Sequence, residues 1–170
     1  MTRTMWLTVG LVTVLALGLA VPGQAADEDE ARKASVAVVV QVSAPPIVDE
    51  AVVAGGALRR LNDAFKQSER LMLVDPERTQ QVARRIELGA KLTPREVHRL
   101  ADVLEADRVV VVRLNLRDQF QIRVQGLIFN GRGQELFEFH TTVGARELET
   151  AIERMGNVLV EHLLPALLRR

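Results

Sequence analysis

The chain of 170 residues contains no cysteine, no tyrosine and one tryptophan. The absence of cysteine excludes a disulfide scaffold, a thiol nucleophile, a thiolate zinc site and a diacylated lipoprotein anchor. Basic and acidic side chains are equal in number, 22 of each. Domains that bind nucleic acids usually have an excess of basic residues, with aromatic residues among them that stack on bases. This sequence has neither, so we expect no nucleic-acid partner.

Residues that carry hydrolytic chemistry are also scarce. Only three serines are present, and none lies in a nucleophile-elbow sequence. The histidines His98, His140 and His162 lack the close spacing of a metal site. Acidic pairs such as Asp102 with Glu105 have the helical spacing of surface charges. We expect no catalytic, cofactor-binding or metal-binding residue, with a ligand or base role for one histidine as the less favoured alternative.

The amino terminus has the pattern of a secretory signal peptide. Arg3 precedes an apolar run, and the helix-breaking pair Pro22-Gly23 leads to the small residue Ala25. A basic start, an apolar centre and small residues before the cleavage point are typical of such peptides. We predict a signal peptide at residues 1–25 and a periplasmic mature chain. An uncleaved anchor is the alternative, because the apolar run is close to the shortest that spans a bilayer.

The rest of the chain is long enough for one domain. The 145 residues after the predicted signal peptide carry a formal net charge of −1, and a chain of this length can bury its own core. We predict a charged, solvated linker at residues 26–34 and a single domain at 35–170. No later segment approaches membrane-spanning length, so no transmembrane span is expected after signal cleavage.

Hydrophobic periodicity predicts the element order β-α-β-α-α-β-β-β-α. A nearly continuous β-branched run at 36–42 is typical of a strand buried on both faces, and apolar residues spaced by three and four predict helices. In chain order, the predicted elements are strand 36–42, helix 49–68, strand 70–75, helix 76–88, a helix that begins after Thr93, strands 108–116, 119–126 and 135–143, and a helix from about 145 to Pro165.

These elements predict an α/β (α+β) fold with a mixed sheet of about five strands. The early strands need crossover connections, whereas the last three form an antiparallel meander. We expect the helices mainly on one face of the sheet. The apolar sides of the elements predict one core, formed by Leu61, Phe65, Leu100, Leu104, Ile122, Val124, Phe137, Phe139, Ile152 and Leu159.

The opposite face of this sheet is expected to be polar. Two strands alternate polar and apolar residues with period two, the pattern of a strand with one wet face. A turn at 130–133 joins them, flanked by two leucines that could serve as an apolar anchor. One interpretation is a merely solvated sheet. The other is a partner surface formed by Gln121, Arg123, Gln125, Leu127, Leu136, Glu138 and His140.

Four segments also resemble a known family of domains. They are the opening strand 36–42, the strand followed by Asp-Pro at 70–76, the sequence Ala-Asp-Val-Leu-Glu-Ala-Asp-Arg-Val-Val-Val-Val at 101–112, and the hairpin 127–136. Together they resemble the small periplasmic α/β domain at the amino terminus of the translocation protein TolB. The same type of domain occurs in the curli secretion protein and in lipoprotein activators of peptidoglycan synthases. The resemblance covers residues 35–168.

The resemblance implies a function without catalysis. Members of this group mostly act as non-enzymatic parts of envelope assemblies, so it implies an exported interaction domain that binds an envelope protein. A periplasmic small-ligand-binding protein or a hydrolase remains the alternative, and some relatives form rings, so a homo-oligomer is also possible.

Overall fold

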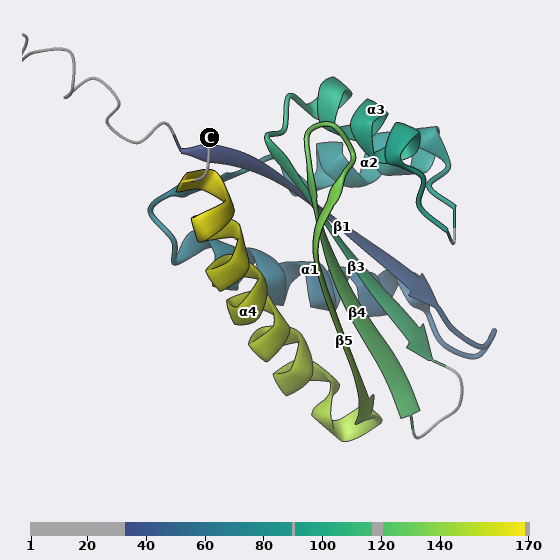
Figure 1. Ribbon diagram of the computed structural model, residues 1–170. Helices are drawn as coiled ribbons and strands as arrows, with labels where there is room; N and C mark the ends of the chain where they lie inside the picture. The colour runs from purple at the N-terminus through teal and green to yellow at the C-terminus, as the bar shows by residue number, and fades with distance from the viewer. Residues whose placement is uncertain (1–32, 90, 117–120, 169–170) are drawn as a thin grey trace, which may run out of the picture. The chain divides into compact units, whose positions relative to one another are not determined.

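The computed structural model describes residues 33–89, 91–116 and 121–168, with side chains to residue 164. Five strands form one mixed sheet with four α-helices and a short 3₁₀ helix, as Figure 1 shows. The fold class and the predicted order of elements are confirmed. The predicted signal peptide and residues 26–32 of the predicted linker lie outside the described residues.

In chain order, the elements are β1 (Ala34–Ser43), α1 (Glu50–Lys66), β2 (Leu71–Leu73), α2 (Pro76–Ile86), α3 (Pro94–Leu104), β3 (Arg108–Leu116), β4 (Gln121–Asn130), β5 (Glu135–Gly144), η1 (Ala145–Glu147) and α4 (Leu148–Leu168).

The strands lie in the order β2-β1-β3-β4-β5. β1 is parallel to both of its neighbours, and β3, β4 and β5 are antiparallel to one another. β2 pairs only with the first three residues of β1, Ala34 to Val36. The rest of β1 is therefore an edge on that side.

Side chains at three helix starts explain why the chain turns where it does. Asp49 accepts hydrogen bonds from two backbone amides of α1, and Asp75 accepts one from α2. Thr93 and Glu96 form a reciprocal capping box at the start of α3. Such caps satisfy amides that have no partner within the helix.

The helices cover both faces of the sheet, which corrects the expectation of helices mainly on one face. α1 and α4 pack on one face against alternate valines of β1 and β3, and α2 and α3 pack on the other. The reason lies in the β-branched runs of β1 and β3, in which both sets of alternating side chains are apolar and must be buried. In Figure 1, α2 and α3 lie at the end of the sheet beside the β4–β5 turn.

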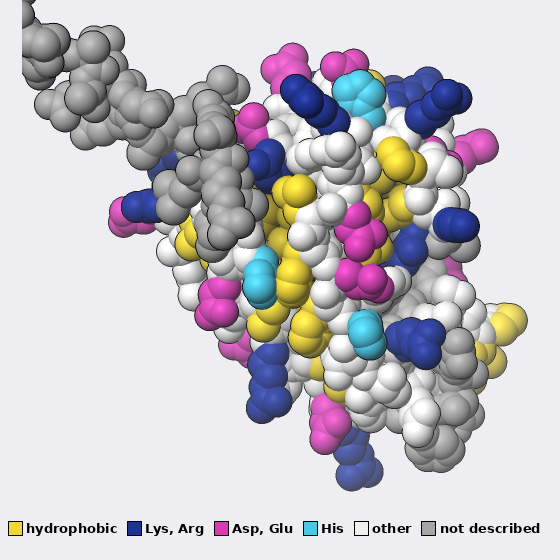
Figure 2. All heavy atoms as spheres, viewed as in Figure 1, with side chains coloured by type: hydrophobic (Ala, Val, Ile, Leu, Met, Phe, Trp, Pro, Cys, Tyr) yellow, Lys and Arg dark blue, Asp and Glu magenta, His cyan; other side chains and the backbone are white. Residues whose placement is uncertain are grey.

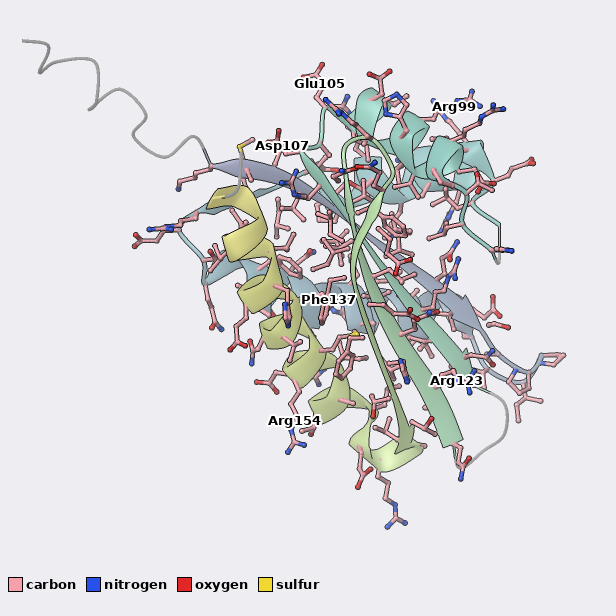
Figure 3. The ribbon with its side chains drawn as sticks, viewed as in Figure 1. Arg99, Glu105, Asp107, Arg123, Phe137 and Arg154 are labelled. Atoms are coloured by element: carbon pink, nitrogen blue, oxygen red, sulfur yellow. The ribbon has the colours of Figure 1, made fainter. Side chains whose placement is uncertain are left out.

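The core is consequently divided into two clusters rather than one. Leu61, Phe65 and Leu159 are fully buried in the cluster under α1 and α4. Leu100 and Leu104, predicted to share that core, lie in the cluster under α2 and α3. Phe137 and Phe139 are half-buried at the margin of the first cluster; Figure 3 shows Phe137 between β5 and α4.

The last helix differs from its prediction at both ends. It begins after a 3₁₀ turn and continues through position 165 to Leu168, although Pro165 was expected to end it. α4 approaches α1 closely at Gly156, where a Cβ would lie 2.9 Å from the Cβ of Ala64. Glycine is therefore required at this crossing, since even alanine would push the two helices apart.

A polar contact joins the two central parallel strands at their start. Ser35 is buried, and its backbone N–H donates to Oδ2 of Asp107 at 3.0 Å. The Asp107 N–H in turn donates to Oγ of Ser35 at 2.9 Å. Asp107 lies in the turn between α3 and β3, beside Glu105 (Figure 3). The contact fixes the register in which β3 begins next to β1.

Candidate functional site

The candidate site is the part of the sheet that α2 and α3 leave uncovered. Strand register places Gln41 of β1, Arg113 of β3, Gln125 of β4 and His140 of β5 opposite one another. These four residues, the arginine row, cross four strands in a straight line. The next row toward the carboxyl ends of β1 and β3 contains Ser43, Asn115, Arg123 and Thr142. We call the two rows together the polar face.

The sequence of β4 explains where the helices stop covering this face. Its first residues alternate between exposed or half-buried and buried side chains, up to Gln125. From Gly126 to Phe129 every residue is buried, since Leu127 and Phe129 pack in the cluster under α2 and α3. The change from alternating to continuous apolar sequence thus coincides with the boundary between wet and covered sheet.

Arg113 lies at the centre of the arginine row and is half-buried. Its Nε donates to Oε1 of Gln41 at 3.0 Å, and one terminal nitrogen, Nη2, donates to the carbonyl of Gly89 at 3.3 Å. Gln41 is held in turn, because its Nε2 donates to the carbonyl of Leu88 at 3.1 Å. Burial lowers the pKa of Arg113 from its ordinary value. The guanidinium is therefore oriented and partly removed from water, but it stays positively charged.

The outer part of the polar face adds a second cation. Arg123 is exposed and lies opposite Asn115 on β3, close to the start of β4. Figure 3 shows it on the far side of the strands from α4. On β5, Glu138 accepts a hydrogen bond of 2.7 Å from Nε2 of Gln125. A shallow hollow of about 400 Å³ lies between the two arginines, lined by side chains of β1, β3 and β4. The hollow can hold a polar or anionic group.

The sequence-predicted surface residues fall on one side of β4 and β5. Gln125 lies opposite His140, and Leu127 lies opposite Glu138. Gln121, Arg123, Glu138, His140 and Leu136 are exposed, and Gln125 is half-buried. Leu127 needs correction, because it is only 4% exposed in the cluster under α2 and α3. Of the two leucines, only Leu136, which is 44% exposed, can offer an apolar contact.

Sequence reasoning missed five members of the polar face, namely Gln41, Ser43, Arg113, Asn115 and Thr142. The first four lie on β1 and β3, whose composition predicts burial on both faces. The signal that could have revealed these four is their position, because all of them follow the β-branched runs. The ends of parallel strands are where α/β sheets commonly place binding groups.

The histidines are separated in the structure as they are in the sequence. Nδ1 of His98 lies 2.7 Å from the carbonyl oxygen of Gly131, and the ring of His162 stacks on Phe137 with 3.8 Å between centroids. His140 is exposed in the arginine row. Among the described residues, no three of His, Asp and Glu are placed to hold a metal ion.

Charges on the visible surface are mixed. Figure 2 shows basic, acidic and histidine side chains interspersed with apolar ones over the side that carries β5 and α4. This view has no large patch of a single charge, in keeping with the balanced composition. Within the described part of the chain, no helix has both the length and the apolar character needed to cross a bilayer.

A second hollow, of about 410 Å³, lies at the free edge of β1 between α1 and α2. Its lining includes Gln80, whose Nε2 is buried and has no hydrogen-bond partner among the described residues. The side chains around it include small residues of both helices, such as Ala51, Ala54 and Ala83.

The chain is similar to several solved structures, at low sequence identity. No family model matches the chain, and no curated protein matches its sequence. Among solved structures, the chain is similar to the LpoB C-terminal domain from Salmonella enterica, with a TM-score of 0.47 and 13% identity over 65% of this chain and 82% of that one. It is similar to TolB from Acinetobacter baumannii, with a TM-score of 0.46 and 12% identity over 80% of this chain and 28% of that one. It is also similar to a PelC dodecamer from Paraburkholderia phytofirmans, with a TM-score of 0.43 and 11% identity over 77% of this chain and 86% of that one. TolB, which the sequence resembles, is thus among these structures, and the likeness is one of fold.

Proposed function

We propose that the chain is an exported, non-enzymatic domain of a bacterial envelope assembly, and that it binds a protein partner through the polar face and the exposed side of β5. The observation that carries this proposal is the arginine row. It places a half-buried, oriented arginine at the centre of a sheet surface that no described element covers.

The composition of this surface suits contact with a protein. Arginine is enriched at protein interfaces, whereas lysine is depleted, and the polar face has two arginines and no lysine. The exposed side chain of Leu136 supplies an apolar group on the same side of β5. The face is also open and shallow, which fits a protein surface better than the enclosed pocket typical of small-molecule sites.

Export is the second part of the proposal and rests on the amino-terminal sequence. The basic start, apolar run and small residues before position 26 favour secretion to the periplasm. The absence of cysteine leaves no site for a lipid anchor of the diacylated type.

The proposal is tested by capture of a partner from envelope extracts with the immobilised mature chain. The double variant Arg123→Glu with His140→Glu reverses the charge of the surface and should abolish capture without lowering the melting temperature. The control is Arg154→Glu with Asn157→Glu, two exposed residues of α4 whose replacement changes the net charge by the same amount. Figure 3 shows that Arg154 points away from the sheet.

Two results would contradict the proposal. Capture that survives the double variant would move the interface to another surface, with the exposed face around Arg59 tested next. Equal loss of capture in the control would show a general effect of charge. Size-exclusion chromatography with light scattering distinguishes a partner protein from the alternative of a homo-oligomer, and thermal shift against small ligands tests the alternative of a ligand-binding protein.

A further inference from the structure

We infer that Arg113 is the anchor of a carboxylate-binding site, and that the carboxylate belongs to an acidic segment of the protein partner. This inference rests on the proposed docking surface and specifies the chemistry of the partner. Arg113 and Arg123 supply the positive charge, and Asn115 supplies an amide donor between them.

The first argument is that no acidic side chain among the described residues pairs with Arg113. Within the described part of the chain, the ion pair found is Arg60 with Glu149, which joins α1 to α4 on the other face of the sheet. The described partners of Arg113 are neutral, namely Gln41 and the carbonyl of Gly89. A charge that is partly removed from water is costly unless it is paired, so a carboxylate at this position would be stabilised.

The second argument is the orientation of the guanidinium. Its Nε and Nη2 are engaged by Gln41 and Gly89, which fixes the plane of the group. Nη1 has no partner among the described residues and remains available to an acceptor. An arginine that is already oriented loses less side-chain entropy when it binds, and its charge-assisted hydrogen bonds to a carboxylate are strong.

The third argument is the charge around the hollow. Arg113 and Arg123 lie on neighbouring strands, offset by one pair of residues, with no acidic residue in either polar row. The nearest acidic side chain along β5 is Glu138, which lies in the adjacent row opposite Leu127 and accepts from Gln125. An acidic segment that extends from Arg113 toward Arg123 would therefore meet positive charge.

The shape of the site favours a carboxylate on a protein chain over a free anion. The hollow is shallow and open, and its described lining is formed by strand residues. That described lining contains no glycine-rich loop or helix amino terminus of the kind that enclose free phosphate. A carboxylate on a polypeptide gains further contacts from its neighbours along the polar face.

The test uses the purified mature chain and defined probes. The probe is a capped hexapeptide of glutamate, with a capped hexapeptide of glutamine and inorganic phosphate for comparison. Binding is followed by the NMR signals of the arginine Nε–H groups, and affinity by titration at low ionic strength. We expect saturable shifts of the Arg113 and Arg123 signals with the glutamate peptide and none with the glutamine peptide.

Three variants make the result specific. Arg113→Gln should weaken binding of the glutamate peptide at least tenfold, and Arg123→Gln at least threefold. The matched control Arg154→Gln, on the outer side of α4, should change it less than twofold. Arg123 is exposed and has no described hydrogen bond, so Arg123→Gln remains informative if Arg113→Gln does not fold.

Each other outcome contradicts the inference. The absence of saturable shifts at Arg113, or equal weakening by Arg154→Gln, would show that there is no carboxylate site. Phosphate binding at Arg113 more tightly than the glutamate peptide would identify a free anion as the ligand. The proposed function fails separately, because only that proposal is contradicted when envelope capture survives Arg123→Glu with His140→Glu.

Discussion

Gln41 and Arg113 lie opposite each other on neighbouring parallel strands, and Nε of Arg113 donates a hydrogen bond of 3.0 Å to Oε1 of Gln41. The amide of Gln41 is itself fixed by the carbonyl of Leu88, after α2. The orientation of the arginine thus depends on a connection between the sheet and the chain segment that follows α2. Because these hydrogen bonds hold both side chains in place, this part of the polar face has a defined geometry and is not a set of independent solvated side chains.

Replacement of Gln41 with alanine should release the Arg113 side chain. A typical hydrogen bond contributes about 1 kcal/mol net, so exchange of the Arg113 Nε–H with water should accelerate about fivefold. NMR exchange spectroscopy measures this rate. Gln125→Ala is the control, since Gln125 bonds to Glu138 and makes no described bond to Arg113. An unchanged exchange rate in Gln41→Ala would show that the guanidinium is not held by this contact.

Truncation of the core under α1 and α4 should be strongly destabilising. Leu61 is fully buried in this cluster, and Leu61→Ala should lower the free energy of unfolding by about 2–5 kcal/mol because it removes apolar contacts and leaves a cavity. Phe139→Ala should cost less, since Phe139 is half-buried. Urea denaturation gives both values, with Leu136→Ala as the exposed control, expected within about 0.5 kcal/mol of the wild type. Equal effects of Leu61→Ala and Leu136→Ala would contradict the observed packing.

The division of the core could have been predicted from the sequence of β1. A strand whose alternate residues are apolar on both faces, such as 36–40, requires a helical layer on each side. Helices were expected on one face because the alternation in β4 and β5 was weighted more than this run. The run in β1 correctly predicts a covered second face, and the alternation in β4 correctly predicts an exposed part of that face, because α2 and α3 cover only part of the sheet. Which rows they cover depends on strand register, which periodicity along one strand does not determine.

The turn between β4 and β5 should tolerate no side chain at Gly133. This residue has φ of +77°, and a Cβ there would lie 2.0 Å from the carbonyl oxygen of Pro94 at the start of α3. Gly133→Ala should therefore lower the free energy of unfolding by about 2 kcal/mol or more. Gly55→Ala is the matched control. Gly55 lies in α1 with open space around it, and the substitution should stabilise the fold by up to about 1 kcal/mol. Thermal or urea denaturation that showed the same sign for both variants would contradict this account.

The capping box of α3 should make part of the stability depend on pH. Hydrogen bonds from the backbone N–H and the hydroxyl of Thr93, 2.7 and 2.8 Å long, lower the pKa of Glu96 from its ordinary value of 4.5. Because the pKa is lower in the folded state, the stabilisation is fully present above about pH 4.5 and is lost as the pH falls through the folded-state value. The stability difference between wild type and Glu96→Gln should therefore shrink on acidification.

A direct measurement of the carboxyl group checks the cause. NMR titration of Glu96 in Thr93→Ala should give a pKa closer to the ordinary value than in the wild type, because the hydroxyl donor is removed. If the pKa of Glu96 were the same in both proteins, the side-chain hydrogen bond of the cap would not be responsible.

Only part of the candidate site could be predicted from the sequence. Gln121, Arg123, Gln125, Glu138 and His140 belong to strands with clear alternation, so their common face followed from period two. Gln41 and Arg113 lie on the same face as these residues because β1 pairs with β3 and β3 pairs with β4. Such pairing brings together residues 72 apart in sequence, and no local pattern reports it. Leu127 was misplaced for the same reason, since the helix that covers it comes from another part of the chain.

The final prediction concerns maturation of the chain. If residues 1–25 are a signal peptide, the exported protein should begin at Ala26, because Gly23 and Ala25 are the small residues that the peptidase pocket accepts before the cleaved bond. Mass spectrometry of the protein recovered from the periplasm should give a first residue of Ala26. Ala25→Arg should block processing, because a long charged side chain replaces a small one, whereas Gln24→Arg changes the neighbouring position and should leave the cleavage site unaltered. Recovery of a chain that begins at Met1 or Thr2 in the wild type would show instead that the segment is retained as an anchor.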